Sequence, residues 1–205
     1  MTKTGQSDDP ELWHRIRDGE PDAFVVLYEE LSDAVFGFCL RRSGSWDVAQ
    51  DCTSLVFLEA WRLRSTLRES SSGTAWLFGI AVNVIRNTTR TRRRHTELLR
   101  RLPLNDVDRG FESDAAERLD AEQRLKKVLL ALNRLPARER DVISLATWAK
   151  LDTAGIAAAL DIPVGTAKSR LSRGRRRLME LSTDDVPDKP DSSPEFDPLG
   201  SGVSS

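Results

Sequence analysis

The stretch from Thr74 to Arg101 constrains the fold most, because it predicts one long helix with two unlike faces. One face is apolar at the spacing of an amphipathic helix, with Leu77, Ile80, Ala81, Val84, Ile85 and Thr88. The other face carries amides, guanidiniums and an indole: Trp76, Asn83, Asn87, Arg90 and Arg94, with Arg86 and Arg93 beside them. Thr74 is the expected N-cap. The apolar face predicts a helical core. The basic face indicates nucleic acid, with a solvated charged surface as the alternative.

The charges of the chain are segregated although they nearly cancel. The 205 residues leave room for one or two small domains, and their net charge is −1. Arginine gathers at 86–101 and 170–177, whereas acidic residues dominate the first third and 106–122. Locally basic helices can hold phosphate even in a protein of nearly neutral total charge.

Several functional classes are disfavoured by what the chain contains. Cys39 and Cys52 lie in apolar helical patterns without metal-ligand spacing, so we expect buried reduced thiols, with a redox pair as the alternative. We find no nucleotide-binding loop and no Ser/His/Asp set, and His14 and His95 are isolated, so no enzymatic activity and no cofactor are expected. No signal peptide and no apolar run near the ~18 residues of a membrane span are present, which predicts a cytoplasmic protein.

The first part of the chain predicts a compact helical bundle. Three helices precede the basic one: a short helix capped by Asp8 or Asp9 and ended by Gly19, a second that opens at Pro21 and is broken at Ser43–Gly44, and a third from Trp46 to about Leu63 capped by Ser45. The third has more apolar surface than one neighbour can cover, so it lies centrally or keeps a patch for a partner. A serine-rich loop, 65–73, leads into the basic helix. Four such helices form a bundle.

A second helical unit follows a change of composition. Residues 102–116 read as a flexible acidic linker. An apolar stripe then runs to Leu135, Pro136 suits the first turn of the next helix, and that helix packs Val142, Ile143, Leu145 and Ala146. The end of the unit is a short helix, 153–160, capped by Asp152, then a turn and a basic helix from Val164 to Leu181. This order is the helix-turn-helix pattern.

The last helix of this pattern also has two faces. Ala167, Leu171, Gly174 and Leu178 form the inward stripe, and close packing would explain the glycine. Hydroxyl and basic side chains suit base edges and phosphates in a major groove, and the candidate contacts are Thr166, Lys168, Ser169, Arg170, Ser172, Arg173 and Arg176. An exposed basic surface helix is the alternative. Residues 183–205 are rich in Asp, Pro, Ser and Gly, which predicts disorder.

Three stretches resemble a known family. Trp46–Trp61 resembles region 2.2 of bacterial sigma factors, Thr74–Asn83 with its arginine-rich continuation resembles regions 2.3 and 2.4, and Leu135–Leu171 resembles region 4. Their order and the short linker are typical of the extracytoplasmic-function (ECF) group. The resemblance implies an all-α protein of two small helical domains: region 2 over 9–101, the linker over 102–116, region 4 over 117–182 and a tail over 183–205.

The resemblance also implies a function, that of a promoter-specificity subunit of RNA polymerase. Region 2 would bind the clamp helices of core polymerase through Asp47, Asp51, Leu55, Phe57 and Leu58. It would hold the opened minus-ten strand through Trp76, Asn83, Arg86, Asn87, Arg90 and Arg94, with a base pocket at loop 65–73. Region 4 would read the minus-thirty-five element with helix 164–177, and the flap of the large polymerase subunits is a further expected contact of the protein. An anti-sigma factor is the expected inhibitor.

Two other functions remain open at this stage. A freestanding helix-turn-helix regulator would explain residues 120–181 but leaves the two earlier motifs without a role. A protein-binding adaptor would use the apolar helix 46–63, and it is compatible with a sigma factor that an anti-sigma factor sequesters.

Overall fold

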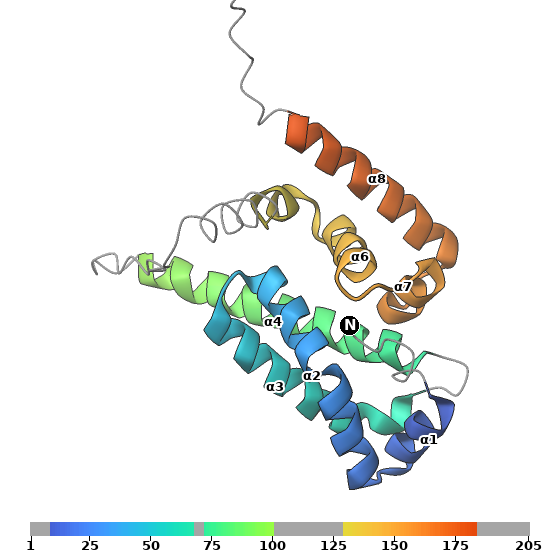
Figure 1. Cartoon of the computed structure of the whole chain (residues 1–205). Coiled ribbons are helices and arrows are strands. Elements are labelled where there is room, and N and C mark those ends of the chain that lie inside the picture. The colour runs from blue at the N-terminus through green and yellow to red at the C-terminus, as the bar shows by residue number, and fades with distance from the viewer. Residues whose placement is uncertain (1–8, 68–71, 101–128, 184–205) are drawn as a thin grey trace, which may run out of the picture.

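The computed structural model describes residues 9–67, 72–100 and 129–183, and every regular element in these ranges is helical (Figure 1). The predicted linker over 102–116, the start of the second domain and the tail lie outside the described residues. The prediction of an all-helical protein is confirmed for the described part of the chain.

The N-terminal domain consists of α1 (Pro10–Asp18), α2 (Pro21–Ser43), α3 (Trp46–Leu63), a 3₁₀ turn (Arg64–Thr66) and α4 (Gly73–Arg100). The predicted caps of the first and third helices are confirmed, since Asp9 accepts from the amide of Glu11 and Ser45 accepts from the amide of Val48. Gly19 and Gly44 end α1 and α2 with φ of 88° and 68°, a left-handed conformation that glycine adopts without a steric penalty.

The start of α4 differs from the sequence prediction. Thr74 is not the N-cap, because the helix already begins at Gly73 and the hydroxyl of Ser72 accepts from the amide of Ala75 at 3.1 Å. Gly73 lies against the indole of Trp13, and a Cβ at this position would come within 2.0 Å of its ring. The chain can therefore enter α4 this close to α1 only with a glycine here.

The C-terminal domain contains helical residues 129–134, α6 (Ala137–Thr147), α7 (Thr153–Leu160) and α8 (Val164–Thr183). Asp152 caps α7 as predicted, accepting from the amide of Gly155 at 2.7 Å. The inward stripe of α8 is also confirmed, and a Cβ on Gly174 would come within 2.9 Å of Ile143, so close helix packing explains this glycine.

The two domains pack against each other through α4 and α7 (Figure 1). Gly79 permits this approach, because a Cβ there would stand 2.4 Å from the backbone oxygen of Ala159. The rings of Phe38 and Trp148 add an edge contact between the domains, with centroids 6.4 Å apart. Consequently α4 is covered by α7 near Gly79, on a side that its apolar stripe did not predict. Val82, which also lies outside that stripe, is fully buried.

Candidate nucleic-acid and polymerase surfaces

The amide-and-arginine face of α4 is exposed, as the sequence predicts. Asn83, Asn87, Arg90 and Arg94 are all exposed. Their spacing of three and four residues places them in one row along the helix. We call these four residues the α4 ridge. Amides can read base edges and guanidiniums can neutralise phosphates, so the ridge suits an unpaired strand.

Trp76 and Arg86 were predicted to share this face, but neither is free on it. Trp76 is half-buried and meets Trp13 edge to face, with centroids 6.2 Å apart. The guanidinium of Arg86 donates to Oδ2 of Asp141 in the C-terminal domain, with its Nε at 2.9 Å. Part of the predicted strand-binding face is therefore engaged in contacts within the protein: Trp76 contacts Trp13 inside the N-terminal domain, and Arg86 contacts Asp141 of the C-terminal domain.

Asp141 is the centre of an ion cluster between the domains. Its side chain is fully buried, and Arg42 of α2 donates to Oδ1 at 2.7 Å while Arg86 of α4 donates to Oδ2. Arg42 also donates to Ser144 at 3.2 Å, and its side chain is only 6% exposed. We call Arg42, Arg86 and Asp141 the interdomain clasp. It joins two positive charges of one domain to one negative charge of the other.

The clasp is a partly buried charge arrangement with an excess of cations, since the side chains of Asp141 and Arg42 are 0% and 6% exposed and that of Arg86 is 42% exposed. Burial lowers the pKa of Arg42, and the nearby guanidiniums of Arg140 and Arg86 act in the same direction, whereas Asp141 opposes them. The Nε of Arg42 is buried without a hydrogen-bond partner. Removing one member of a buried pair costs about 3–5 kcal/mol, because the remaining charge stays desolvated.

Sequence reasoning missed Arg42 and Asp141. In a single sequence each is one charged residue in a charge-rich chain, and nothing in the spacing links them. The one local sign that Asp141 is buried is its place on the same helix face as Leu145, an apolar residue, and Ser144. Both of these neighbours are buried in the structure.

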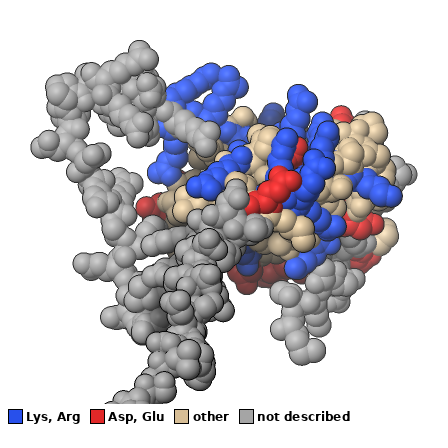
Figure 2. Space-filling model, turned by 90° about the horizontal axis from the view of Figure 1, so that it is seen from above, with Lys and Arg blue, Asp and Glu red and all other residues tan. Residues whose placement is uncertain are grey.

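The basic face of α8 points away from the core. Lys168, Ser169, Ser172, Arg173 and Arg176 are exposed, whereas Thr166 and Arg170 are half-buried. Figure 2 views the molecule from the α8 side and shows Lys and Arg side chains spread across this face, with a few acidic side chains between them.

Two arginines on α8 form ion pairs with acidic residues: one pair is exposed and lies within α8, and the other joins α8 to α6. Arg176 forms an exposed pair with Glu180 at 3.6 Å, which solvent weakens. Arg177 pairs at 2.6 Å with Glu139 of α6, which is buried. Arg177 therefore fixes α8 on α6, while the predicted contacts on the outward face stay accessible.

The predicted polymerase-binding residues divide into exposed and buried ones. Asp47, Asp51, Leu55 and Leu58 are exposed on α3, and the two leucines are 43% and 62% exposed. Phe57 is 4% exposed and therefore does not lie on that surface.

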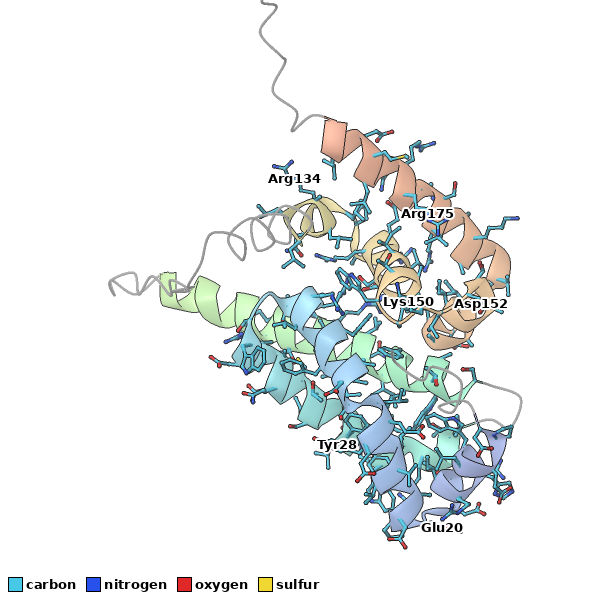
Figure 3. All side chains as sticks on the ribbon, viewed as in Figure 1. Glu20, Tyr28, Arg134, Lys150, Asp152 and Arg175 are labelled. Atoms are coloured by element: carbon cyan, nitrogen blue, oxygen red, sulfur yellow. The ribbon has the colours of Figure 1, made fainter. Side chains whose placement is uncertain are left out.

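Phe57 instead packs beneath α2. Its ring meets that of Tyr28 edge to face, with centroids 4.8 Å apart. Tyr28 is exposed on the part of the N-terminal domain remote from α8, with Val25 and Val26 exposed nearby in the sequence (Figure 3). Sequence reasoning assigned Tyr28 to the apolar face of this helix, but its side chain is 49% exposed. It missed Val25 and Val26, whose position outside the apolar stripe was an available signal.

The described residues give no sign of a metal site or of a membrane span. In these ranges no group of three or more His, Cys, Asp or Glu side chains is placed to hold a metal ion, and no helix is long and apolar enough to cross a bilayer. Cys39 and Cys52 are buried free thiols, as expected. Burial raises the pKa of Cys39 to about 12, so its thiol stays protonated at neutral pH.

Comparison with known proteins places both domains in one family. The family model for Sigma-70 region 2 matches residues 27–95, and that for Sigma-70 region 4 matches residues 125–178. The ECF RNA polymerase sigma-E factor of Escherichia coli is 31% identical over 185 residues, which span 84% of this chain and 93% of that protein. The chain belongs to the ECF sigma factors of the sigma-70 family.

Other relatives agree with this assignment. The sigma factor HrpL of Pseudomonas syringae is 30% identical over 150 residues, 70% of this chain and 78% of that protein. This ECF sigma factor thus acts in transcription initiation and is not an enzyme. The freestanding operator-binding regulator is thereby set aside.

Solved structures share the fold. CnrH, in complex with the cytosolic domain of CnrY, aligns with a TM-score of 0.66 at 22% identity over 87% of this chain and 99% of that chain. The sigma factor RpoE of Bartonella quintana, in complex with the anti-sigma factor NepR, aligns with a TM-score of 0.58 at 27% identity over 80% of this chain and 98% of that chain.

Proposed function

We propose that this sigma factor uses three surfaces on two domains: α3 for core polymerase, the α4 ridge for the opened minus-ten strand, and α8 for the minus-thirty-five duplex. The domain limits that go with this proposal are 9–101 and 117–182, with 102–116 joining them and 183–205 as a tail. The observation that carries the proposal is the exposure of two chemically different surfaces, the α4 ridge and α8, on separate domains.

The polymerase contact is formed by α3 in this proposal. Leu55 and Leu58 present apolar surface to solvent, and Asp47 and Asp51 add negative charge beside it. An exposed apolar patch with a charged rim is typical of a protein-binding surface. The buried ring of Phe57 supports the helix from beneath, and Tyr28 extends the surface onto α2.

The minus-ten strand binds along the α4 ridge. Asn83 and Asn87 supply amides for base edges, and Arg90 and Arg94 neutralise phosphates. Binding of the separated strand supplies the free energy for opening, and no hydrolysis is needed. The predicted base pocket at 65–73 includes residues 68–71, which lie outside the described ranges.

The minus-thirty-five element binds to α8 in its major groove, while other parts of the C-terminal domain contact the polymerase flap. Exposed Arg173 and Arg176 are placed for guanine edges or phosphates, and the hydroxyls of Ser169 and Ser172 lie on the same outward side. Two weak sites on one chain gain affinity from their high effective concentration.

The packed arrangement of the domains represents an inactive state in this proposal. Asp141 holds the guanidinium of Arg86, so the domains separate before the full α4 surface meets DNA. An anti-sigma factor is the proposed partner of the inactive state. Two structural relatives support this: RpoE was solved in complex with the anti-sigma factor NepR, and CnrH in complex with the cytosolic domain of CnrY. We place this activity in the cytoplasm, where the polymerase acts.

Transcription in vitro with core polymerase tests the proposal. The purified protein should support promoter-dependent run-off transcripts from promoters selected for it. Complete absence of promoter-dependent initiation would contradict the polymerase and promoter roles together.

Variants then separate the two DNA surfaces. Asn83→Ala should reduce permanganate reactivity of the minus-ten region while core binding is unchanged, since only a base contact is removed. Arg173→Ala should cost roughly 1–3 kcal/mol on an intact upstream element if the side chain reads a base. An equal loss on scrambled upstream sequences would assign Arg173 to a phosphate instead.

A further inference from the structure

Helix α8 begins with an exposed apolar side chain. Val164 is the first residue of this helix and is 52% exposed, whereas Ala167 and Leu171 of the inward stripe are 0% and 9% exposed. A single exposed valine is common on protein surfaces and is not by itself evidence of a binding site. The residues around Val164 on α8 decide whether it has a partner.

Val164 lies at the end of a row of exposed side chains. Four exposed residues follow one another at four-residue spacing along one side of α8: Val164, Lys168, Ser172 and Arg176. We call them the α8 row. The last three are among the predicted contacts to the minus-thirty-five element. Val164 extends this surface to the first turn of the helix, and the N-terminal residues of a recognition helix are those that contact base edges.

The start of α8 is open to an approaching molecule. A Cβ added to Gly165 would meet no heavy atom within 4 Å, apart from its chain neighbours and the backbone of its own helix. Val164 also borders a shallow groove at the turn between α7 and α8, together with the short side chains of Ala154 and Ala158 and the ring of Pro163. The first turn of α8 is therefore accessible to the edge of a DNA base.

The side chain of Val164 has no hydrogen-bond donor or acceptor, so it can recognise only an apolar group. In the major groove the base edges present donors and acceptors, and the C5 methyl group of thymine is the apolar group among them. We propose that Val164 reads a thymine of the minus-thirty-five element by contact with this methyl group. The contact rests on the proposed function, because it forms only when α8 lies in the major groove.

Helix geometry limits where this thymine lies. One four-residue step along the α8 row covers about 6 Å of the helix axis, and successive base pairs are about 3.4 Å apart. The A·T pair that Val164 contacts should therefore lie within about two base pairs of the pair that Lys168 contacts. The thymine can belong to either strand, since both strands present their base edges in the same groove.

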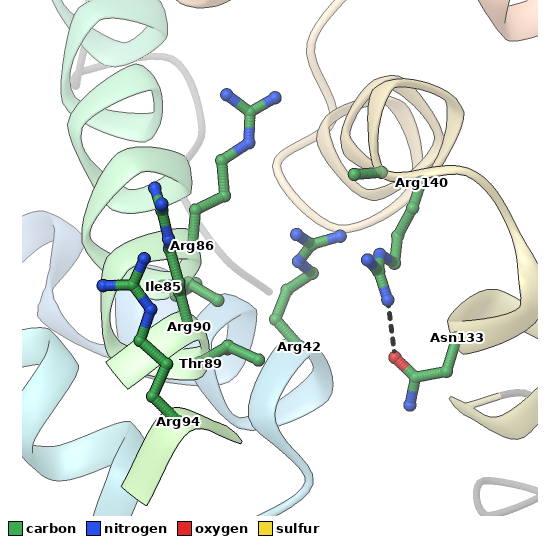
Figure 4. Close-up of a pocket in the computed structure, with 9 residues that line it drawn as sticks. Arg42, Ile85, Arg86, Thr89, Arg90, Arg94, Asn133 and Arg140 are labelled. Atoms are coloured by element: carbon green, nitrogen blue, oxygen red, sulfur yellow. Dashed lines mark hydrogen bonds between the residues drawn. The ribbon is translucent and has the colours of Figure 1, made fainter. Parts of the chain in front are cut away.

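The contact is separate from the packing of the two domains. Arginines of α2, α4 and α6 line the cavity between the domains together with Asn133, and among the lining residues that the structure describes none belongs to α8 (Figure 4). A change at Val164 therefore leaves this cavity and the interdomain clasp in place. Its effect on DNA binding can be measured with the full-length protein.

Replacement of thymine by uracil in the promoter tests the contact, because it removes the methyl group and keeps every hydrogen-bonding group of the base pair. Core polymerase carrying the full-length protein is titrated onto a promoter selected by run-off transcription, with each thymine of the minus-thirty-five element replaced in turn. At one position uracil should weaken binding about four-fold, the loss expected for one buried methyl group. Val164→Ala should bind the thymine promoter several-fold more weakly, and uracil at that position should have no further effect on this variant.

Val25→Ala is the matched control. Val25 is 54% exposed on α2 of the other domain, so this change removes the same methyl groups from an equally exposed valine. The four-fold effect of uracil should persist in Val25→Ala.

Three results would overturn the contact and leave the proposed function intact. All uracil-substituted promoters could bind as tightly as the thymine promoter. An undiminished uracil effect in Val164→Ala would assign the methyl group to another residue. Selected promoters could lack an A·T pair at the expected distance from the pair that Lys168 contacts. Equal binding of intact and scrambled minus-thirty-five elements by the unsubstituted protein would instead refute the proposed role of α8, and the contact with it.

Discussion

Asp141→Asn should open the molecule. The substitution keeps the size of the side chain and removes its charge, while the side chain of Arg42 is 6% exposed in the packed state. Losing one partner of a buried pair costs about 3–5 kcal/mol. We take the lower limit, because Arg86 is 42% exposed and keeps part of its hydration.

The cost should affect the packing of the domains and not their folding. Asp141 belongs to one domain and both arginines to the other, so all three are hydrated when the domains separate. A cost of about 3 kcal/mol corresponds to a change of roughly a hundred-fold in the ratio of packed to separated molecules.

Energy transfer between two dyes measures this ratio. Cysteines introduced at exposed Ala34 and Ala158 place one dye on each domain. The native thiols of Cys39 and Cys52 are buried with raised pKa values, so they should remain unlabelled at neutral pH. Transfer should fall in Asp141→Asn compared with the unsubstituted protein.

Glu139→Gln is the matched control. Glu139 is also a buried acid paired with an arginine, but Arg177 belongs to the same domain, so this change should lower stability without lowering energy transfer. Unchanged transfer in Asp141→Asn, or an equal fall in Glu139→Gln, would refute the assignment of the clasp as the interaction that holds the domains together.

Three further changes probe the packing. Gly79→Ala should also reduce energy transfer, since its Cβ would stand 2.4 Å from the backbone oxygen of Ala159 in the packed form. In the separated form the same change should stabilise α4 by about 1 kcal/mol, because alanine has a higher helix propensity than glycine, and thermal unfolding measures this gain. Ser72→Ala should lower the free energy of unfolding by about 1 kcal/mol in urea, because the amide of Ala75 loses its cap. Cys39, with its pKa raised to about 12 by burial, stays protonated when folded but ionises near pH 9 when unfolded. The buried thiol of Cys39 therefore contributes its full share to the free energy of unfolding below pH 9, and this share falls by about 1.4 kcal/mol per pH unit as the pH rises toward 12. Urea unfolding of Cys39→Ala over the same pH range should lack this decrease.

Local structure was largely predictable because its causes are local. Ser45 and Asp152 precede apolar helical patterns and cap the helices that follow, as expected. Thr74 was the wrong choice of cap, because the hydroxyl of Ser72 accepts from the amide of Ala75 and α4 begins one residue earlier, at Gly73.

The candidate surfaces were predictable only in part. Exposure of Asn83 and Arg90 follows from the helical period, since the apolar residues occupy the other side of α4. The burial of Phe57 does not, because α3 is apolar on more than one side and only the position of α2 decides which aromatic ring is covered. The sequence pattern therefore predicted the helix that offers the surface but not every residue on it.

By itself the sequence determined the helices, the caps formed by Asp9, Ser45 and Asp152, and the two unlike faces of α4 and α8, because each depends on residues within a few turns of one another. Its motifs also determined membership of the family. Only the tertiary structure decided that the two domains pack together, that Asp141 is enclosed by Arg42 and Arg86, and that arginines of both domains surround one cavity. These features depend on contacts between residues about 55 to 100 positions apart, for which hydrophobic periodicity carries no signal.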